Sequence, residues 1–221
     1  MSVTVLLNSA LLKFGQTPQN ARFSDDFYSA INDAQNDFAT SRSWGFLRTS
    51  GNVTTTADTQ TVALPSNYGK PYNDRGALRI TSPAASSGDK VQLMPYEQWL
   101  SSYWEDGTDT GEPTYAYIQG SSLYLSPTPD AVYIIAMQYY KIPTVIADSS
   151  TDITIPTEYL EVLKKMVYRR LQDDGYSSVQ ELQISDTDIQ RLIGNCAKDD
   201  IKKYGGMTFN LNSTTYKRRT I

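Results

Sequence analysis

The side chains best suited to acid–base chemistry in this sequence are three pairs of adjacent carboxylates, Asp25-Asp26, Asp173-Asp174 and Asp199-Asp200. The chain contains no histidine, which excludes a Ser-His-Asp triad and histidine-ligated metals. Nothing flanks the three pairs that would shift the pKa of a carboxylate, as acid–base catalysis requires. We therefore expect the first pair in the first turn of a helix, the other two at solvated helix ends or faces, and no catalytic residue.

Cys196 is the one cysteine, so the chain cannot form an internal disulfide and suits a reducing compartment. With no histidine to pair with it, a buried structural thiol is a better interpretation than a nucleophile. The sequence also lacks a phosphate loop, a dinucleotide fingerprint, a nucleophile elbow and a calcium loop. We expect no enzyme, no cofactor and no metal site.

The balance of charge is acidic, with a formal net charge of −4. This argues against a protein that holds DNA through phosphate contacts, although DNA can still pass close to an acidic wall. Residues 1–15 have neither the basic start of a signal peptide nor an apolar run long enough to span a bilayer. We expect a protein that is cytoplasmic at synthesis and makes no membrane contact.

The elements that must position these side chains are helices near both ends of the chain, where apolar residues recur at helical spacing. Gly15 and Gly175 are expected to stop two of the helices, and Ser24 and Asp186 to cap two others. The expected helices cover residues 3–14, 24–43, 156–174 and 187–204.

Between these helices the chain is rich in Thr, Val and Tyr, in short segments bounded by Gly, Pro and Ser, which is a strand signal. Residues 132–140 are too continuously apolar for a solvent-facing edge. We expect six or seven strands. They are a hairpin within 46–64 that turns near 57–59, single strands at 77–81 and 90–94, a hairpin of 115–118 with 123–126, and the strand 132–140. A short helix is expected at 96–103.

The simplest arrangement of these elements is an α+β fold. It consists of an antiparallel four-helix bundle with a small antiparallel β domain inserted between its second and third helices. The expected domains are residues 1–44 with 154–204 for the bundle, 45–153 for the β domain and 205–221 for an extended C-terminal arm. In the arm, Phe209 and Leu211 alternate with polar residues ahead of a basic end. That pattern fits a disordered tail, or an arm that adds a strand to or threads into a neighbouring subunit.

Tyrosine (16) far outnumbers phenylalanine (6), and it suits half-buried surfaces and interfaces. An alternative function is therefore a carbohydrate- or surface-binding module that uses the Tyr-rich β region. Such a platform needs exposed rings clustered on one face. Packing in the β core or at subunit contacts is the competing interpretation of the same residues.

Three stretches, in order, carry a family resemblance. The first is a helix pair ending in Ser43-Trp44, followed by a Thr-rich hairpin ending TVALPSNY (61–68). The second reads GEPTYAYIQGSSLYLSPTPD (111–130) and leads to a strand ending QYYKIP (138–143). The third is the returning helix, IPTEYLEVLKKMVYRRLQDD (155–174). Over most of residues 20–175 the chain resembles the head-to-tail adaptor, or connector, proteins of tailed bacteriophages.

This resemblance implies a structural virion protein at the head–tail interface, with twelve copies in a homo-oligomeric ring beneath a dodecameric portal protein. The helical part would face or flank the portal, the β part would meet the tail or nozzle protein, and genomic DNA would pass through the channel without sequence-specific binding. In similar adaptors a C-terminal extension reaches into the portal. Here the candidate portal-binding residues are Phe209, Leu211, Tyr216, Lys217, Arg218 and Arg219.

Overall fold

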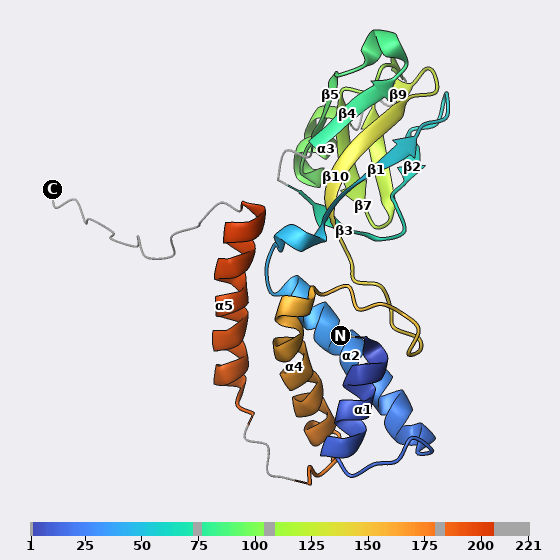
Figure 1. Cartoon of the computed structure of the whole chain (residues 1–221). Coiled ribbons are helices and arrows are strands. Elements are labelled where there is room, and N and C mark those ends of the chain that lie inside the picture. The colour runs from blue at the N-terminus through green and yellow to red at the C-terminus, as the bar shows by residue number, and fades with distance from the viewer. Residues whose placement is uncertain (1, 73–76, 104–108, 180–183, 206–221) are drawn as a thin grey trace, which may run out of the picture.

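The computed structural model describes residues 2–72, 77–103, 109–179 and 184–205, so the candidate arm residues from Phe209 to Arg219 lie outside the described residues. Figure 1 shows a helical part, made of α1, α2 and α4, below a β part, with α5 standing beside α4. The helices are α1 (Val3–Lys13), α2 (Ala21–Thr40), α3 (Tyr96–Tyr103), α4 (Leu160–Asp173) and α5 (Asp186–Tyr204), and the 3-10 turns are η1 (Gly45–Leu47), η2 (Ala84–Ser86) and η3 (Thr157–Tyr159).

The helix ends follow local capping rules. Gly15 after α1 has φ +59°, a left-handed conformation that glycine adopts without steric cost, so the predicted stop is confirmed. The start of α2 was predicted wrongly at Ser24. Asn20 caps this helix instead, because its side-chain oxygen accepts the Phe23 N–H at 3.2 Å.

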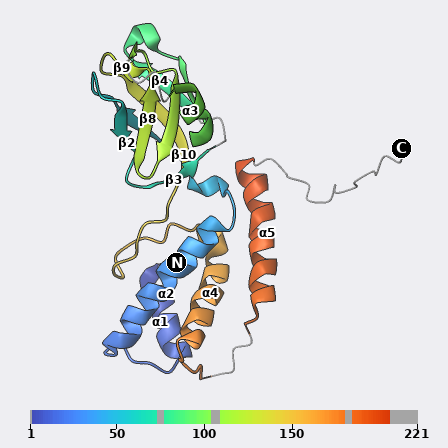
Figure 2. The ribbon, with the colours of Figure 1, turned by 180° about the vertical axis from the view of Figure 1, so that it is seen from behind.

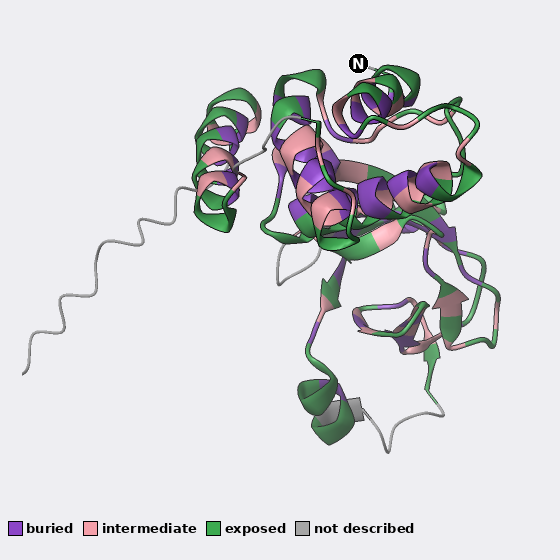
Figure 3. Cartoon of the chain, turned by 90° about the horizontal axis from the view of Figure 1, so that it is seen from below, coloured by how far each residue is buried: buried purple, intermediate pink, exposed green. Residues whose placement is uncertain are grey.

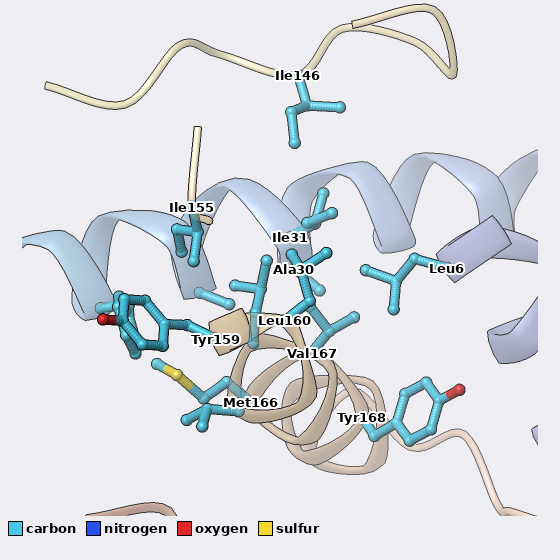
Figure 4. Close-up of a cluster of buried hydrophobic side chains, with 14 of the residues drawn as sticks. Leu6, Ala30, Ile31, Ile146, Ile155, Tyr159, Leu160, Met166, Val167 and Tyr168 are labelled. Atoms are coloured by element: carbon cyan, nitrogen blue, oxygen red, sulfur yellow. The ribbon is translucent and has the colours of Figure 1, made fainter. Parts of the chain in front are cut away.

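The helical part has its own buried core, to which α1, α2 and α4 all contribute. Figure 4 shows Ala30 and Ile31 of α2 facing Leu160 and Val167 of α4. At the upper end of α2, the Trp44 ring stacks on Phe38 with centroids 4.4 Å apart, and its indole N–H donates to the Phe38 carbonyl at 2.6 Å. Trp44 is therefore a core residue with its polar atom satisfied.

The segment between β10 and α4 completes this core rather than only linking two parts. Ile146 and Ile155 are buried in it and approach α2 in Figure 4. Two amides of α2 hold the segment: Asn32 bonds both the N–H (2.8 Å) and the carbonyl (2.9 Å) of Ile146, and Gln35 accepts the Thr154 N–H at 3.1 Å. Paired backbone groups let this loop run next to a buried surface without an unsatisfied polar atom.

The β part is a curled eight-stranded sheet in the order β1-β10-β4-β5-β7-β8-β2, with β3 also on β10, beside a two-stranded pair β6-β9. Pairing is antiparallel except for β5 with β7 and β6 with β9. The strands are β1 (Arg48–Thr54), β2 (Thr61–Ala63), β3 (Tyr68–Pro71), β4 (Ala77–Ser82), β5 (Lys90–Leu93), β6 (Thr110–Gly111), β7 (Tyr115–Gln119), β8 (Ser122–Ser126), β9 (Thr128–Pro129) and β10 (Ile134–Lys141).

The predicted hairpin of 115–118 with 123–126 is confirmed as β7 and β8, and the apolar strand 132–140 is confirmed as the interior strand β10. The predicted hairpin within 46–64 is wrong. β1 pairs with β10 and β2 pairs with β8, so these two consecutive strands lie at opposite ends of the sheet order. The expected count of six or seven strands was too low.

The expected four-helix bundle with a small antiparallel β insertion is also wrong. The structure is a mixed α+β fold with five described α-helices, one of which, α3, belongs to the β part, and with a large eight-stranded sheet. A narrow buried stripe on α5 contacts α4 from outside, and Figure 3 shows wide exposed surface around it. The segment with Ile146 and Ile155 packs on α2 as a further part of the same core. The predicted domain boundaries stay a prediction.

Candidate interaction site at the waist

The most extensive polar contacts between the two parts gather where the C-terminal end of α5 meets η1 and the start of β1; we call this junction the waist. The carboxylate of Asp200, 5% exposed, accepts the Gly45 N–H at 2.7 Å. A Cβ on Gly45 would lie 2.8 Å from Cγ of Tyr204, so only glycine allows this approach of α5. Because Gly45 has no side chain, the end of α5 can pack closely against η1.

Arg48, at the start of β1, binds the end of α5 from the other side. Its guanidinium donates to the carbonyl of Tyr204, one of the helix-end carbonyls that lack a partner within the helix. It also donates to the Tyr72 hydroxyl at 3.0 Å. A cation at this position also complements the negative end of the helix dipole.

From Arg48 a row of cations and rings continues over the outer surface of β10. The Arg48 guanidinium lies 5.4 Å from the Tyr72 ring, Tyr72 lies 5.8 Å from Tyr140, and the Lys70 ammonium lies 5.4 Å from the Tyr140 ring. Burial raises the pKa of Tyr140, which keeps the phenol neutral. Next to this row is a pocket of about 350 Å³, the waist pocket, lined by Gly45, Arg48, Thr49, Ser50, Tyr72, Gln138 and Tyr204.

The structure gives the three predicted carboxylate pairs different roles. Asp26 accepts the Tyr176 hydroxyl at 2.6 Å, and Asp173 pairs with Arg169 at 3.5 Å. Asp199 is exposed and lies 3.7 Å from Lys202, so the predicted solvated face is confirmed for this residue. For Asp200 the prediction was wrong, because this carboxylate is buried in the waist.

Arg170 was missed as a contact between helices. From α4 it pairs with Asp33 at 3.6 Å and with Asp37, two carboxylates four residues apart on one face of α2. That spacing could have identified the two acids as a pair, but not their partner. Cys196 is buried as predicted, and burial raises the pKa of its thiol, which disfavours the reactive thiolate.

The Tyr-rich region forms a small aromatic cluster between α3 and the β7–β8 hairpin, on the side seen in Figure 2. Tyr117 lies 4.6 Å from both Trp99 and Tyr124, and Trp99 and Tyr117 are 3% and 5% exposed. Their faces are used in contacts with each other. Of the residues in contact there, Tyr96 presents the more exposed ring, at 47%. This arrangement fits packing of α3 better than a sugar platform.

Apolar side chains are exposed at both ends of the molecule. Leu12 on α1 is 81% exposed, and Val179, whose N–H bonds the Lys13 carbonyl, is 70% exposed. Leu12 is in the last turn of α1 and Val179 follows α4, and Figure 1 shows that the C-terminal ends of these two helices point away from the sheet. Val132, 59% exposed, precedes β10, whose first residues pair with the last residues of β1 and so lie away from the waist.

Within the described part of the chain, no three His, Cys, Asp or Glu side chains are close enough to hold a metal ion. No helix described is long and apolar enough to cross a membrane. The polar contacts at the waist join two parts of the molecule that each have a buried core of their own.

Comparison with known proteins gives the class of this chain. The sequence model of the SU10 adaptor protein family matches residues 1–204, and the chain belongs to this family of bacteriophage head–tail adaptors. Membership supports a structural role in the virion and contact with other virion components. A search of curated proteins gives no match. Residues 205–221, which hold the predicted arm, lie beyond the matched region.

Proposed function

We propose that this protein forms a homo-oligomeric ring, of twelve copies in analogy with the adaptors it resembles, that joins the portal protein to the tail. The observation that carries the proposal is the family match across residues 1–204. The formal net charge of −4 suits a channel through which genomic DNA slides without being held. No step of covalent chemistry is needed for this function.

The two-part architecture supports a connector role. Each part has its own buried core, so two ends of one molecule can meet different partners. Exposed Leu12 and Val179 at the helical end and exposed Val132 at the β end provide apolar contact area at both extremes. We assign the helical end to the portal side and the β end to the tail or nozzle side.

The waist gives the proposed arm a fixed starting point. Asp200 and Arg48 hold the last turn of α5, and Gly205 ends it in a left-handed conformation with φ +62°. Residues 206–221 therefore continue from a rigid support. We propose that they bind the portal through the apolar Phe209 and Leu211 and the basic run 217–219.

Removal of residues 207–221 tests the arm directly. We expect the truncated protein to keep its far-UV circular dichroism and melting temperature and to lose binding to the portal protein in a pull-down. A matched full-length variant, with Phe209→Ser and Leu211→Ser, separates the anchors from chain length and should also bind weakly. Normal portal binding by the truncated protein would show that the arm is not the contact.

A further inference from the structure

The waist pocket combines surfaces from both parts of the molecule. Tyr204 comes from α5 and Gly45 from η1, whereas Ser50 and Gln138 come from the paired strands β1 and β10. A side chain bound in the pocket would therefore contact the helical part and the β part together. Its volume of about 350 Å³ is enough for one or two amino-acid side chains.

Among the residues that the structure describes, the cation in this pocket has no ion-pair partner. Arg48 is half-buried, yet no Asp or Glu among the described residues lies within ion-pair distance of it. By contrast, Arg169 and Arg170 each pair with two aspartates. The helix-end carbonyl of Tyr204 and the Tyr72 hydroxyl compensate the charge of this half-buried guanidinium only in part, because neither group is an anion. The Asp200 carboxylate at the waist hydrogen-bonds the Gly45 N–H and is not within ion-pair distance of Arg48.

The remaining groups around Arg48 suit a carboxylate. Ser50 is two residues from Arg48 and so faces the same side of β1, opposite Gln138. The hydroxyl of Ser50 and the amide of Gln138 can donate to carboxylate oxygens. The planar guanidinium matches a carboxylate in two-point geometry, and Lys70 adds a second cation that has no ion pair among the residues described.

We propose that the waist pocket binds an acidic side chain, Asp or Glu, of another virion protein. The choice of a virion protein as partner rests on the proposed function. The chain's own C-terminal end is a poor occupant, because Lys217, Arg218 and Arg219 would approach Arg48 and Lys70 with like charge.

DNA fits the same pocket less well than an acidic side chain. Binding a nucleic-acid backbone needs several unpaired cations. Of the cations named at the waist, Arg48 and Lys70 have no ion pair among the described residues, whereas Lys203 pairs with Glu158 at 2.6 Å. The net charge of −4 opposes DNA further. A pocket with one half-buried guanidinium suits a single carboxylate.

The test uses the full chain and a short fluorescein-labelled peptide of alternating Glu and Gly, with a Gln-Gly peptide as neutral control, in a low-salt anisotropy titration. Ser50→Glu supplies a carboxylate to Arg48 from within the pocket without removing any waist contact. We expect it to weaken Glu-Gly binding by about 10- to 100-fold, as loss of one charge-assisted contact would. Arg48→Gln should weaken it similarly, and Arg79→Gln, an exposed arginine outside the pocket, should leave it unchanged.

Equal binding by the wild-type and Ser50→Glu proteins, or no binding by the wild type, would overturn the inference. So would a labelled DNA duplex that binds with the same dependence on Arg48, since the ligand would then be a phosphate. The melting temperature of Ser50→Glu confirms that the variant is folded. If the wild-type protein forms rings on the portal but does not bind the Glu-Gly peptide, this inference is rejected and the proposed function is not affected.

Discussion

The buried carboxylate of Asp200 accepts the backbone N–H of Gly45 across a separation of 155 residues, at 2.7 Å. This bond ties the last helix to the turn that links the helical part to the sheet. It lies beneath the start of the proposed portal-binding arm, so the position of that arm depends on it.

Replacement of Asp200 by Ala should lower the free energy of unfolding, because the buried Gly45 N–H loses its acceptor. A loss of about 1 to 3 kcal/mol is typical of such a change. The Oδ1 atom of Asp200 has no partner in the described structure, so its removal also relieves a burial cost and places the loss toward the lower end. Urea unfolding measures it.

The matched control is Asp199→Ala, which removes an exposed carboxylate paired only with Lys202 and should change stability by less than about 0.5 kcal/mol. If both variants were equally stable, Asp200 would not fix α5 at the waist.

A second prediction compares Gly45, which contacts the end of α5, with Gly194, an exposed glycine on α5 itself. Gly45→Ala introduces a Cβ that collides with Tyr204, so the end of α5 must move and its amides should exchange hydrogen faster. Gly194→Ala lies on α5 where nothing is within 4 Å, and it should stabilise the helix by about 0.5 to 1 kcal/mol. Unchanged exchange at 200–205 in Gly45→Ala would contradict the close docking.

Asn32 provides a third prediction, since its amide satisfies both backbone groups of Ile146. Asn32→Ala leaves these groups without a partner and should cost about 1 to 3 kcal/mol in thermal or urea unfolding. Asn36→Ala, on the exposed side of the same helix, is the control and should have little effect. Similar stability of the two variants would mean that water replaces Asn32 without cost.

Alkaline pH should weaken the β part through Tyr133. Its hydroxyl donates to Asp130 at 2.7 Å, and this bond together with burial raises its pKa to about 12 from 10.0. A phenol with a raised pKa in the folded state stabilises the fold fully below pH 10 and loses that contribution as pH rises toward about 12. Tyr133→Phe should lack this loss between pH 10 and 12. The free energy of unfolding of wild type and Tyr133→Phe is measured between pH 10 and 12. An equal decrease in both proteins would contradict the role of Tyr133.

Local signals in the sequence predict the elements of this fold well. The turn Gly120-Ser121-Ser122 gives the β7–β8 hairpin its correct register, because the two strands are adjacent in the chain. Gly15, Gly175 and Gly205 mark helix ends that need a left-handed residue. Each of these features is decided within a few residues of sequence.

Long-range pairing could not be predicted in the same way. The turn near Asp58 reverses the chain, but it does not specify that Arg48 pairs with Tyr140 and Thr61 with Tyr124. The apolar stripe of α5 predicted that one face of this helix is buried. It did not predict that η1 packs against the end of the helix. The sequence does not distinguish Asp200 from its exposed neighbour Asp199, and only the packing at the waist, where Gly45 bonds it, shows that Asp200 is buried.

The proposed ring between portal and tail is tested most directly by mixing the purified protein with its portal protein and imaging the mixture by negative-stain electron microscopy. We predict ring-shaped particles stacked coaxially on portal rings, with class averages showing twelvefold symmetry. Portal rings without added density, together with adaptor protein that remains monomeric in the same mixture, would contradict the proposal.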